Sequence, residues 1–452
     1  MTLTITEVVK QFKQDWTAQL EPDAILAACR RVGYKWRQRC LNPVVTMHFF
    51  FVQILNGNTA CTHLRHLTKL AVSASAYCQA RMKLPLAIFQ HLLRSTCGRL
   101  QDEQPEEGRW LGHRIFLVDG SSFSMPDTPE LQAHFGQPGG QLPGCGFPVA
   151  HLMILCHAAS GMLQDVLSAP LRTHDLSQVV SLHPELQPTD VLVGDRGLCS
   201  YAHLALLSLR GVHGVFRMHQ KQLVDFTPGR PYVVPGHEQV EQKGKPRSRW
   251  ITRLGKQDQI VEWLKPTACP SWMTKAQFEK LPGHLRLREL RYRTQRPGFR
   301  VQTVTLVTTL LQPHLYTLEA LAALFLTRWR IETNFAHLKT TMGLDVLKCK
   351  TVSGVLKELI VFALIYNLVR LVMCEASKRQ QVDVERISFI DALRWLASAD
   401  NDEPLPPLVV NPNRPNRYEP RVHKRRPKQY SLMRKPRQVL RNQLVSQSLG
   451  LT

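Results

Sequence analysis

The sequence has few of the features that mark zinc-binding or disulfide-rich proteins. Its 452 residues include 11 cysteines, but no two of them form a Cys-x-x-Cys pair. Structural zinc sites usually carry such closely spaced pairs, so we predict no zinc site. An odd number of scattered cysteines, without a regular framework, instead predicts reduced thiols in a reducing compartment.

A long hydrophobic run is also missing. The most apolar segment, residues 359–369, is bounded by charged residues and is too short to cross a bilayer. We therefore expect it to form a buried core helix. The first seven residues lack the basic start and apolar run of a signal peptide. These absences predict a cytoplasmic protein without a membrane partner; in a prokaryotic cell, we expect it to be associated with the nucleoid.

Acidic residues are scarce relative to basic ones. The chain has 35 Asp and Glu against 58 Lys and Arg, a formal net charge of +23. Such an excess predicts a polyanionic partner, and nucleic acid fits it better than a membrane surface. A basic RNA-binding protein would carry the same charge, so the charge does not identify the function.

The segment from Leu318 to Met342 is the most informative one, and we predict that it forms one helix. Phe325, Arg328, Glu332 and Lys339 follow one another at intervals of three, four and seven residues. At about 3.6 residues per turn, these side chains share one face. Apolar side chains form a second stripe beside this face, which should fix the helix to a core: Leu324, Ile331, Phe335, Leu338 and Met342.

A carboxylate between two cations can hold a divalent metal ion while the cations hold phosphates. A solvated surface face is the alternative interpretation. Two upstream carboxylates favour the catalytic one, because Asp119 and Asp195 each follow a short, β-branched, strand-like run. We expect both at the C-terminal ends of strands, where α/β sheets bind ligands. Together with Glu332 they predict a site for two Mg²⁺ ions, or Mn²⁺ in their place, of the kind that cleaves phosphodiesters.

The spacing Y-x2-R-x3-E-x6-K is the hallmark of the YREK-signature group of DDE transposases. It falls here on Phe325, Arg328, Glu332 and Lys339, with Phe in place of the usual Tyr. The segments around Asp119-Gly120-Ser121 and residues 194–197 also match this family, as do residues 76–85. The chain thus resembles an insertion-sequence-4 family DDE transposase over nearly its whole length. Phe325 would lack the hydroxyl that the family's Tyr offers to a DNA phosphate.

This resemblance implies an RNase-H-like (retroviral-integrase-like) core that performs cut-and-paste transposition through metal-dependent cleavage, a DNA hairpin and strand transfer. Asp119, Asp195 and Glu332 would be the catalytic metal ligands. The DNA would comprise terminal inverted repeats and a target, held by a homodimer in the synaptic complex. The predicted DNA contacts are Phe325, Arg328, Lys339, Arg196, Lys424, Arg425, Arg426 and Lys428.

The expected fold is α/β with a mixed sheet, a β-rich insertion and a helical N-terminal domain. We predict a helical DNA-binding domain over residues 1–105 and a catalytic domain over 106–217 and 301–380. Residues 218–300 should form an inserted, mainly β subdomain, and residues 381–452 a C-terminal helix, a Pro-rich linker and a basic tail. Tryptophans in the insertion could stack on an extruded base, although packing in its core is the favoured alternative: Trp250, Trp263 and Trp272.

The tail from residue 414 to 441 has eleven Lys or Arg and one Glu. It is too polar to fold alone, so we expect it to be disordered or to lie along phosphates. A nuclear-localisation signal would have the same kind of Lys- and Arg-rich sequence. For the whole chain, two further hypotheses stay open: an RNase-H-like nuclease or resolvase, and a catalytically inactive DNA-binding derivative of a transposase.

Overall fold

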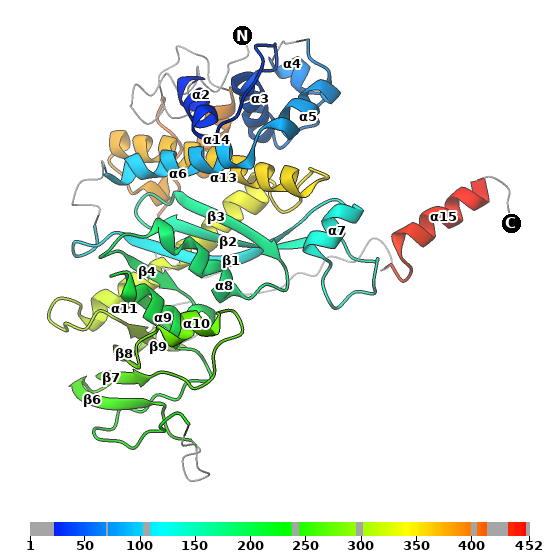
Figure 1. Cartoon of the computed structure of the whole chain (residues 1–452). Coiled ribbons are helices and arrows are strands. Elements are labelled where there is room, and N and C mark those ends of the chain that lie inside the picture. Colours follow the sequence, from blue (N-terminus) through cyan, green and yellow to red (C-terminus); the bar gives the residue numbers. More distant parts are fainter. Residues whose placement is uncertain are drawn as a thin grey trace.

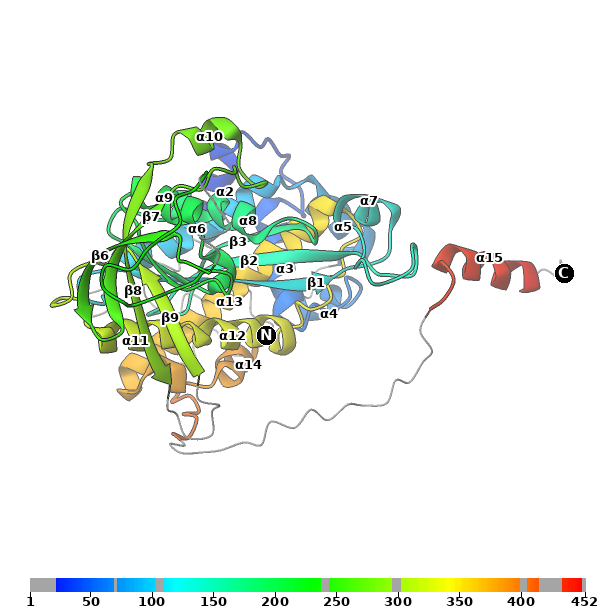
Figure 2. The same ribbon diagram turned by 90° about the horizontal axis from the view of Figure 1, so that it is seen from below.

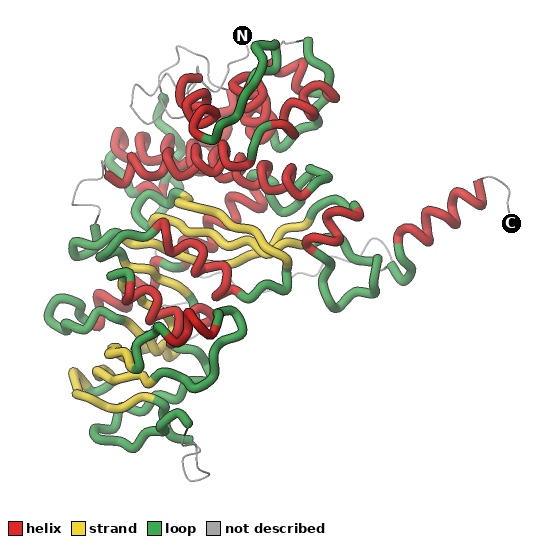
Figure 3. Tube along the Cα trace, in the orientation of Figure 1, coloured by secondary structure: helices red, strands yellow, loops and turns green. Residues whose placement is uncertain are grey.

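The computed structural model describes residues 22–68, 71–102, 109–236, 244–294, 302–398, 405–413 and 433–448. Figures 1 and 3 show a long sheet with helices against both faces and a helical group at one side. Four of the predicted DNA-contacting residues lie outside the described residues: Lys424, Arg425, Arg426 and Lys428.

Nine strands form one sheet in the order β3-β2-β1-β4-β5-β9-β8-β7-β6. Their bounds are β1 Ile115–Ser124, β2 Val149–His157, β3 Leu163–Pro170, β4 Val191–Gly194, β5 His213–Arg217, β6 Ser248–Gly255, β7 Asp258–Leu264, β8 His284–Thr294 and β9 Gln302–Thr308. The first three strands are antiparallel neighbours, whereas β4 runs parallel to both β1 and β5. This mixture of antiparallel and parallel pairs confirms the predicted RNase-H-like α/β fold.

The hairpin between β2 and β3 is held against a long helix, α13 (Val352–Gln380). Gly161 in its turn has φ +71°, and a Cβ there would lie 2.2 Å from Nη2 of Arg370. Nε of Arg370 donates to the Ser160 carbonyl at 2.9 Å, and the Tyr366 hydroxyl donates to the Gly161 carbonyl at 3.2 Å. Only glycine fits here, because both the backbone conformation and the close guanidinium exclude a side chain.

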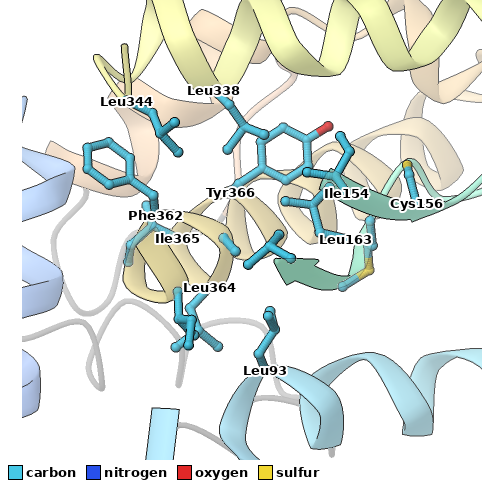
Figure 4. Packing of buried hydrophobic residues seen from close by; sticks show 14 of the residues in the cluster. Leu93, Ile154, Cys156, Leu163, Leu338, Leu344, Phe362, Leu364, Ile365 and Tyr366 are labelled. Atoms are coloured by element: carbon cyan, nitrogen blue, oxygen red, sulfur yellow. The ribbon is translucent and has the colours of Figure 1, made fainter. Parts of the chain in front are cut away.

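Side chains alternate between the two faces of β1. Ile115 and Leu117 belong to the larger of two hydrophobic clusters, and Phe116 and Val118 belong to the other. The larger cluster lies between the sheet and the helices α6, α11, α12 and α13, and Figure 4 shows Leu338, Ile154, Leu163 and Tyr366 of this cluster at close range. The second cluster includes residues of α8 and α9 on the opposite face.

The described helices are α2 Pro22–Arg31, α3 Pro43–Leu55, α4 Leu64–Thr68, α5 Ala74–Lys83, α6 Leu86–Asp102, α7 Pro129–Phe135, α8 Asp175–Leu182, α9 Tyr201–Leu209, α10 Lys275–Glu279, α11 Leu318–Thr327, α12 Trp329–Ala336, α14 Phe389–Ser398 and α15 Arg437–Ser448. Short 3₁₀ helices are η3 His183–Glu185, η4 Arg196–Leu198 and η7 Val384–Arg386, and η6 His337–Thr341 is a π-helix. Helices α2 to α5 gather on the far side of α6 and α13 from the sheet (Figure 1). Helix α15 begins inside the segment that we expected to be disordered or to lie along phosphates, so the expectation of disorder is wrong for residues 437–441, and contact with phosphates stays a prediction.

Strands from the predicted inserted subdomain extend the catalytic sheet. β9 pairs antiparallel with β5 on one side and with β8 on the other, which adds β8, β7 and β6 in turn. Trp263 is 5% exposed, and its ring N–H donates to Oε1 of Glu289 at 2.9 Å. For Trp263 the packing alternative therefore holds. The domain boundaries themselves remain predictions.

Helix α13 is longer than we predicted from its apolar centre. It has 29 residues, and by length and composition alone it could cross a membrane, but 89% of its most apolar window is buried inside the protein. The expectation of a buried core helix is confirmed, whereas the argument from shortness is wrong. Beyond the apolar centre, the charged side chain of Arg370 has a partner within the protein, Glu385, at 2.7 Å.

Candidate active site

Two parallel strands bring Asp119 and Asp195 together. Val118 is opposite Gly194 in the ladder between β1 and β4, so the two aspartates follow paired positions. By alternation, Asp119 lies on the face of Leu117, and Asp195 lies on the face of Val193. Both carboxylates therefore project from one face of the sheet, the face covered by α11 and α12.

Asp119 does not end its strand, which corrects our prediction, whereas Asp195 directly follows β4 as predicted. Strand β1 continues to Ser124 because β2 pairs with it along that whole length. The backbone N–H of Ser124 also donates to the Asp345 carbonyl at 2.9 Å. Asp119 thus lies in the middle of a strand, at the point where its parallel neighbour stops.

The segment Leu318–Met342 is three helical pieces, so the prediction of a single helix is wrong. Helix α11 ends at Thr327, α12 begins at Trp329, and the π-helix η6 follows it. The apolar stripe was predicted correctly, because all five of its side chains are buried in the larger hydrophobic cluster: Leu324, Ile331, Phe335, Leu338 and Met342. Figure 2 shows α11 and α12 in succession along the sheet.

Arg328, at the junction of α11 and α12, bridges two of the three carboxylates. Its Nη1 donates to Oδ2 of Asp119 at 3.0 Å, and its Nη2 donates to Oε1 of Glu332 at 3.3 Å. The arginine side chain is 9% exposed, against 27% for Asp119 and 48% for Glu332. Its Nε is buried and has no hydrogen-bond partner among the described residues. The guanidinium is therefore held by the carboxylates without complete hydrogen bonding.

Burial raises the pKa of the Asp119 carboxyl, and the nearby charges of Asp195 and Glu332 raise it further. The backbone N–H of Gly120 and the Arg328 guanidinium act in the opposite direction without cancelling the effect. The ionised form of Asp119 is thus disfavoured in the protein by itself, and an additional positive charge at this point would stabilise it.

Divalent cations are the natural candidates for that charge. Carboxylate oxygens are the ligands that Mg²⁺ prefers, so the chemistry of Asp119, Asp195 and Glu332 fits such an ion. Among the residues that the structure describes, however, no three Asp, Glu, His or Cys side chains are already arranged as a metal cage. The guanidinium of Arg328 lies between two of the carboxylates instead.

Lys339 lies on the other side of the site and also has a carboxylate partner. Its Nζ donates to the Ser121 hydroxyl at 3.2 Å and lies 3.1 Å from Oδ1 of Asp345. Our sequence analysis missed both Ser121 and Asp345. Alternation along β1 could have indicated Ser121, two residues after Asp119. No local pattern indicates Asp345, because its position depends on the π-helix and on pairing with Ser124.

The turn that carries Asp195 is fixed from behind by buried histidines. Asp195 precedes η4, and its carboxylate makes no capping hydrogen bond there. Nδ1 of His203 hydrogen-bonds the Leu198 carbonyl at the end of η4 at 2.7 Å, and its Nε2 lies 3.0 Å from Nε2 of His183. Burial lowers the pKa of His203 to about 4, so the ring is neutral near pH 7.

Two further residues that we predicted to contact DNA, Phe325 and Arg196, contact other side chains of the protein in the DNA-free structure. Phe325 is 6% exposed, and its ring centroid lies 5.9 Å from the Arg328 guanidinium carbon, so it packs beneath that side chain. Arg196 is exposed, and its Nη1 donates to Oε1 of Gln220 at 3.1 Å. The contacts of both residues with DNA remain predictions.

Comparison with known proteins identifies the family of this chain. A family model described as "Transposase DDE domain" matches residues 110–368, more than half of the chain. The chain therefore belongs to the DDE transposases. Its relatives include two transposases of Escherichia coli (strain K12), one of them named for insertion sequence element IS4, while its membership of the YREK subgroup remains a prediction.

The first of these relatives is InsZ, a transposase by name, which is 26% identical over 141 residues. The match covers 31% of this chain and 47% of InsZ, about half of that relative's length. The second is "Transposase InsG for insertion sequence element IS4", 23% identical over 379 residues, or 79% of this chain and 78% of InsG. A solved structure, of a piggyBac transposase synaptic complex with hairpin DNA, has a TM-score of 0.40 at 11% identity and covers 84% of this chain and 78% of that one.

Family membership defines the broad class of function. The chain belongs to a class of enzymes, the DDE transposases, that generally use divalent metal ions.

Proposed function

We propose that this protein binds the terminal inverted repeats of its insertion sequence and catalyses cut-and-paste transposition, with Asp119, Asp195 and Glu332 as the catalytic carboxylates. The observation that carries the proposal is the projection of Asp119 and Asp195 from one sheet face, with Glu332 on the helix that covers it. Arg328 donates hydrogen bonds to Asp119 and Glu332, and Lys339 donates to Ser121, two residues after Asp119.

The three carboxylates would hold two Mg²⁺ or Mn²⁺ ions. Such ions, when bound, activate the attacking hydroxyl or water and stabilise the leaving oxygen. Arg328 would then exchange the Asp119 and Glu332 oxygens for a DNA phosphate, and Lys339 would exchange Asp345 for another. Charge-assisted contacts of this kind orient the phosphodiester for in-line attack. A hairpin at the element end, strand transfer, a homodimeric synaptic complex and association with the nucleoid complete the proposal.

A cleavage assay tests this proposal. Purified protein is incubated with labelled element ends and Mg²⁺, and nicked, hairpin and joined products are separated on denaturing gels. The proposal predicts all three products from the intact protein. Nicked DNA without hairpin or joined products would favour a nuclease or resolvase. Binding without any cleavage would favour an inactive derivative.

A further inference from the structure

A second group of basic side chains lies away from the carboxylates, between the N-terminal helices and the start of α13. It lines a pocket of about 630 Å³. One wall consists of residues from α3 and α5 and the loop between them, and the other of residues 348–358. Pockets that bind small ligands have volumes of about 300–1,000 Å³.

The charges in this pocket do not balance. Four cationic side chains line it together with one carboxylate, Glu358, so three positive charges are in excess: Arg81, Lys348, Lys350 and Lys357. Three of the cations have hydrogen bonds to neutral oxygens. Lys357 donates to the Met82 carbonyl at 2.9 Å, Arg81 donates to Oε1 of Gln53 at 3.1 Å, and Lys348 donates to the Asn58 carbonyl.

Glu358 is 1% exposed, and uncharged N–H groups bind its oxygens. They are the side-chain amide of Asn58 at 2.6 Å, the backbone N–H of Lys348 at 2.9 and 3.1 Å, and the backbone N–H of Cys349 at 2.8 Å. The carboxylate thus fixes the wall of the pocket and forms no close ion pair there. Lys357 is 2% exposed, and burial, together with the charge of Arg81, lowers its pKa. An anion in the pocket would oppose both effects.

The first turn of α13 also faces the pocket. Thr351 caps this helix, its hydroxyl accepts from the Gly354 N–H at 3.1 Å, and both residues line the pocket. A Cβ on Gly354 would lie 2.8 Å from the Thr351 hydroxyl oxygen and 3.0 Å from Cβ of Cys349. Helix N-termini favour negative charge. The dipole of a 29-residue helix adds to the field of the four side chains, and at this helix end the carboxylate of Glu130 already accepts from the Val352 N–H at 2.8 Å.

Two thiols in the same wall provide a means of detection. Sγ of Cys61 lies 3.6 Å from Sγ of Cys78, and both cysteines line the pocket and are partly exposed. Burial raises the pKa of Cys61, which keeps it a neutral thiol near pH 7. A ligand in the pocket would cover both sulfurs.

We propose that this pocket, which we call the interdomain pocket, binds a phosphate group. Its excess positive charge, its N–H donors and the N-terminus of α13 match a ligand that has only acceptor oxygens. The source is either a DNA backbone phosphate beyond the catalytic face or a free phosphate compound. The proposal goes beyond the transposition reaction, because it requires neither the carboxylates nor a metal ion.

The test measures how fast iodoacetamide alkylates Cys61 and Cys78 in the full-length protein, by mass spectrometry of peptides. Ligand arms contain inorganic phosphate, pyrophosphate or a duplex oligonucleotide, and the reference arm contains chloride at equal ionic strength. We expect at least one phosphate arm to slow alkylation of both thiols about fivefold or more, and Cys269 in the inserted strands' region to be unaffected by the small anions. Equal alkylation rates in the phosphate, pyrophosphate, duplex and chloride arms would overturn the proposal.

Variants identify the residues and the source. Lys350→Gln removes an exposed rim charge that the fold does not need, and Lys275→Gln on α10 is its matched control, also exposed. Protection should weaken several-fold in Lys350→Gln and remain in Lys275→Gln. If DNA is the ligand, Lys350→Gln should also lower the slope of log K against log salt by ~0.9 relative to Lys275→Gln. Protection by phosphate or pyrophosphate but not by the duplex identifies a free ligand, and equal behaviour of the two variants refutes the proposal.

Glu332→Gln separates this proposal from the catalytic one. The variant should lose DNA cleavage and keep full protection of Cys61 and Cys78. If even the unmodified protein fails to cleave DNA but phosphate still protects the thiols, the transposition proposal fails while the interdomain pocket stands.

Discussion

The catalytic face and the interdomain pocket both gather basic side chains around a carboxylate, but they pair them differently. At the catalytic face each of the two cations lies against a carboxylate, Arg328 against Asp119 and Glu332, and Lys339 against Asp345. In the pocket, three cations donate to neutral oxygens. The first cluster is neutralised within the chain, and the second is not.

The difference implies two ways of binding a phosphate. At the catalytic face, the phosphate must replace a carboxylate as partner of Arg328, so phosphate binding is coupled to whatever else engages that carboxylate. In the pocket, a phosphate enters an existing field without breaking an ion pair. We therefore expect binding at the catalytic face to depend on divalent metal ions, and binding in the pocket to be independent of them.

The largest effect should come from removing any one catalytic carboxylate. Asp119→Ala, Asp195→Ala and Glu332→Ala should each abolish cleavage of element ends, because metal-holding groups act as a unit. DNA affinity should remain nearly unchanged, since the basic surface is intact. Gel assays of cleavage beside filter binding of the same DNA measure the two quantities. Nicking by Asp119→Ala in Mg²⁺ at the normal rate would refute the assignment.

A smaller loss should follow removal of the flanking cations. Arg328→Ala and Lys339→Ala should fold normally but lower the yield of hairpin from pre-nicked ends by ~10²-fold, the scale of a lost positioning contact. Arg379→Ala is the control, because Arg379 forms a comparable i,i+4 ion pair with Glu375 at 2.7 Å on α13, in another part of the molecule. Near-normal hairpin yield in both test variants would leave these cations only their ion pairs within the protein and would remove the phosphate contacts from the proposal.

A third, still smaller effect is expected in the affinity of the DNA-free protein for a divalent metal ion. Arg328 now occupies the space between two prospective ligands, so Arg328→Ala should bind Mn²⁺ about tenfold more tightly, or about 1.4 kcal/mol. Titration calorimetry or electron paramagnetic resonance measures this in the DNA-free protein. Lys339→Ala is the matched variant and should change little, because Lys339 contacts Ser121 and Asp345 instead. Weaker Mn²⁺ binding by Arg328→Ala would show that the guanidinium supports the site and does not compete for it.

The smallest expected difference is in how the stability of the two regions depends on acidic pH. Buried His203 holds the turn after Asp195, whereas no histidine lines the interdomain pocket. Its folded pKa of about 4 lies below the ordinary value of 6.5, so the unfolded chain binds the proton more readily. The stability it contributes is complete above about pH 6.5 and is lost as the pH falls toward 4, by roughly 1 kcal/mol at about pH 5.5. Urea unfolding across this range should give a shallower pH dependence for His203→Gln, and an unchanged dependence would contradict the prediction.

Sequence patterns located the parts of the site that depend on local order. Apolar periodicity placed Ile331 and Leu338 in the core, and the strand-like run before Asp195 placed it at a strand end. The length of β1 beyond Asp119 depends on pairing with β2, which no local signal reveals. The interdomain pocket is more remote still, because Asn58 and Glu358, hydrogen-bonded to each other, are 300 residues apart in the chain. Likewise, Arg328 and its partner Asp119 are 209 residues apart in the chain.

The π-helix η6 changes what the seven-residue interval between Glu332 and Lys339 means. In a regular α-helix that interval returns almost to the same angle, and our sequence analysis relied on this. A wider turn at residues 337–341 rotates Lys339 away from that angle and brings it to Ser121 on β1. The seven-residue spacing in the signature therefore places Lys339 correctly only when the helix contains this π-helical turn. Transplanting these residues onto an ideal helix of a designed scaffold would preserve the letters and lose the lysine's direction.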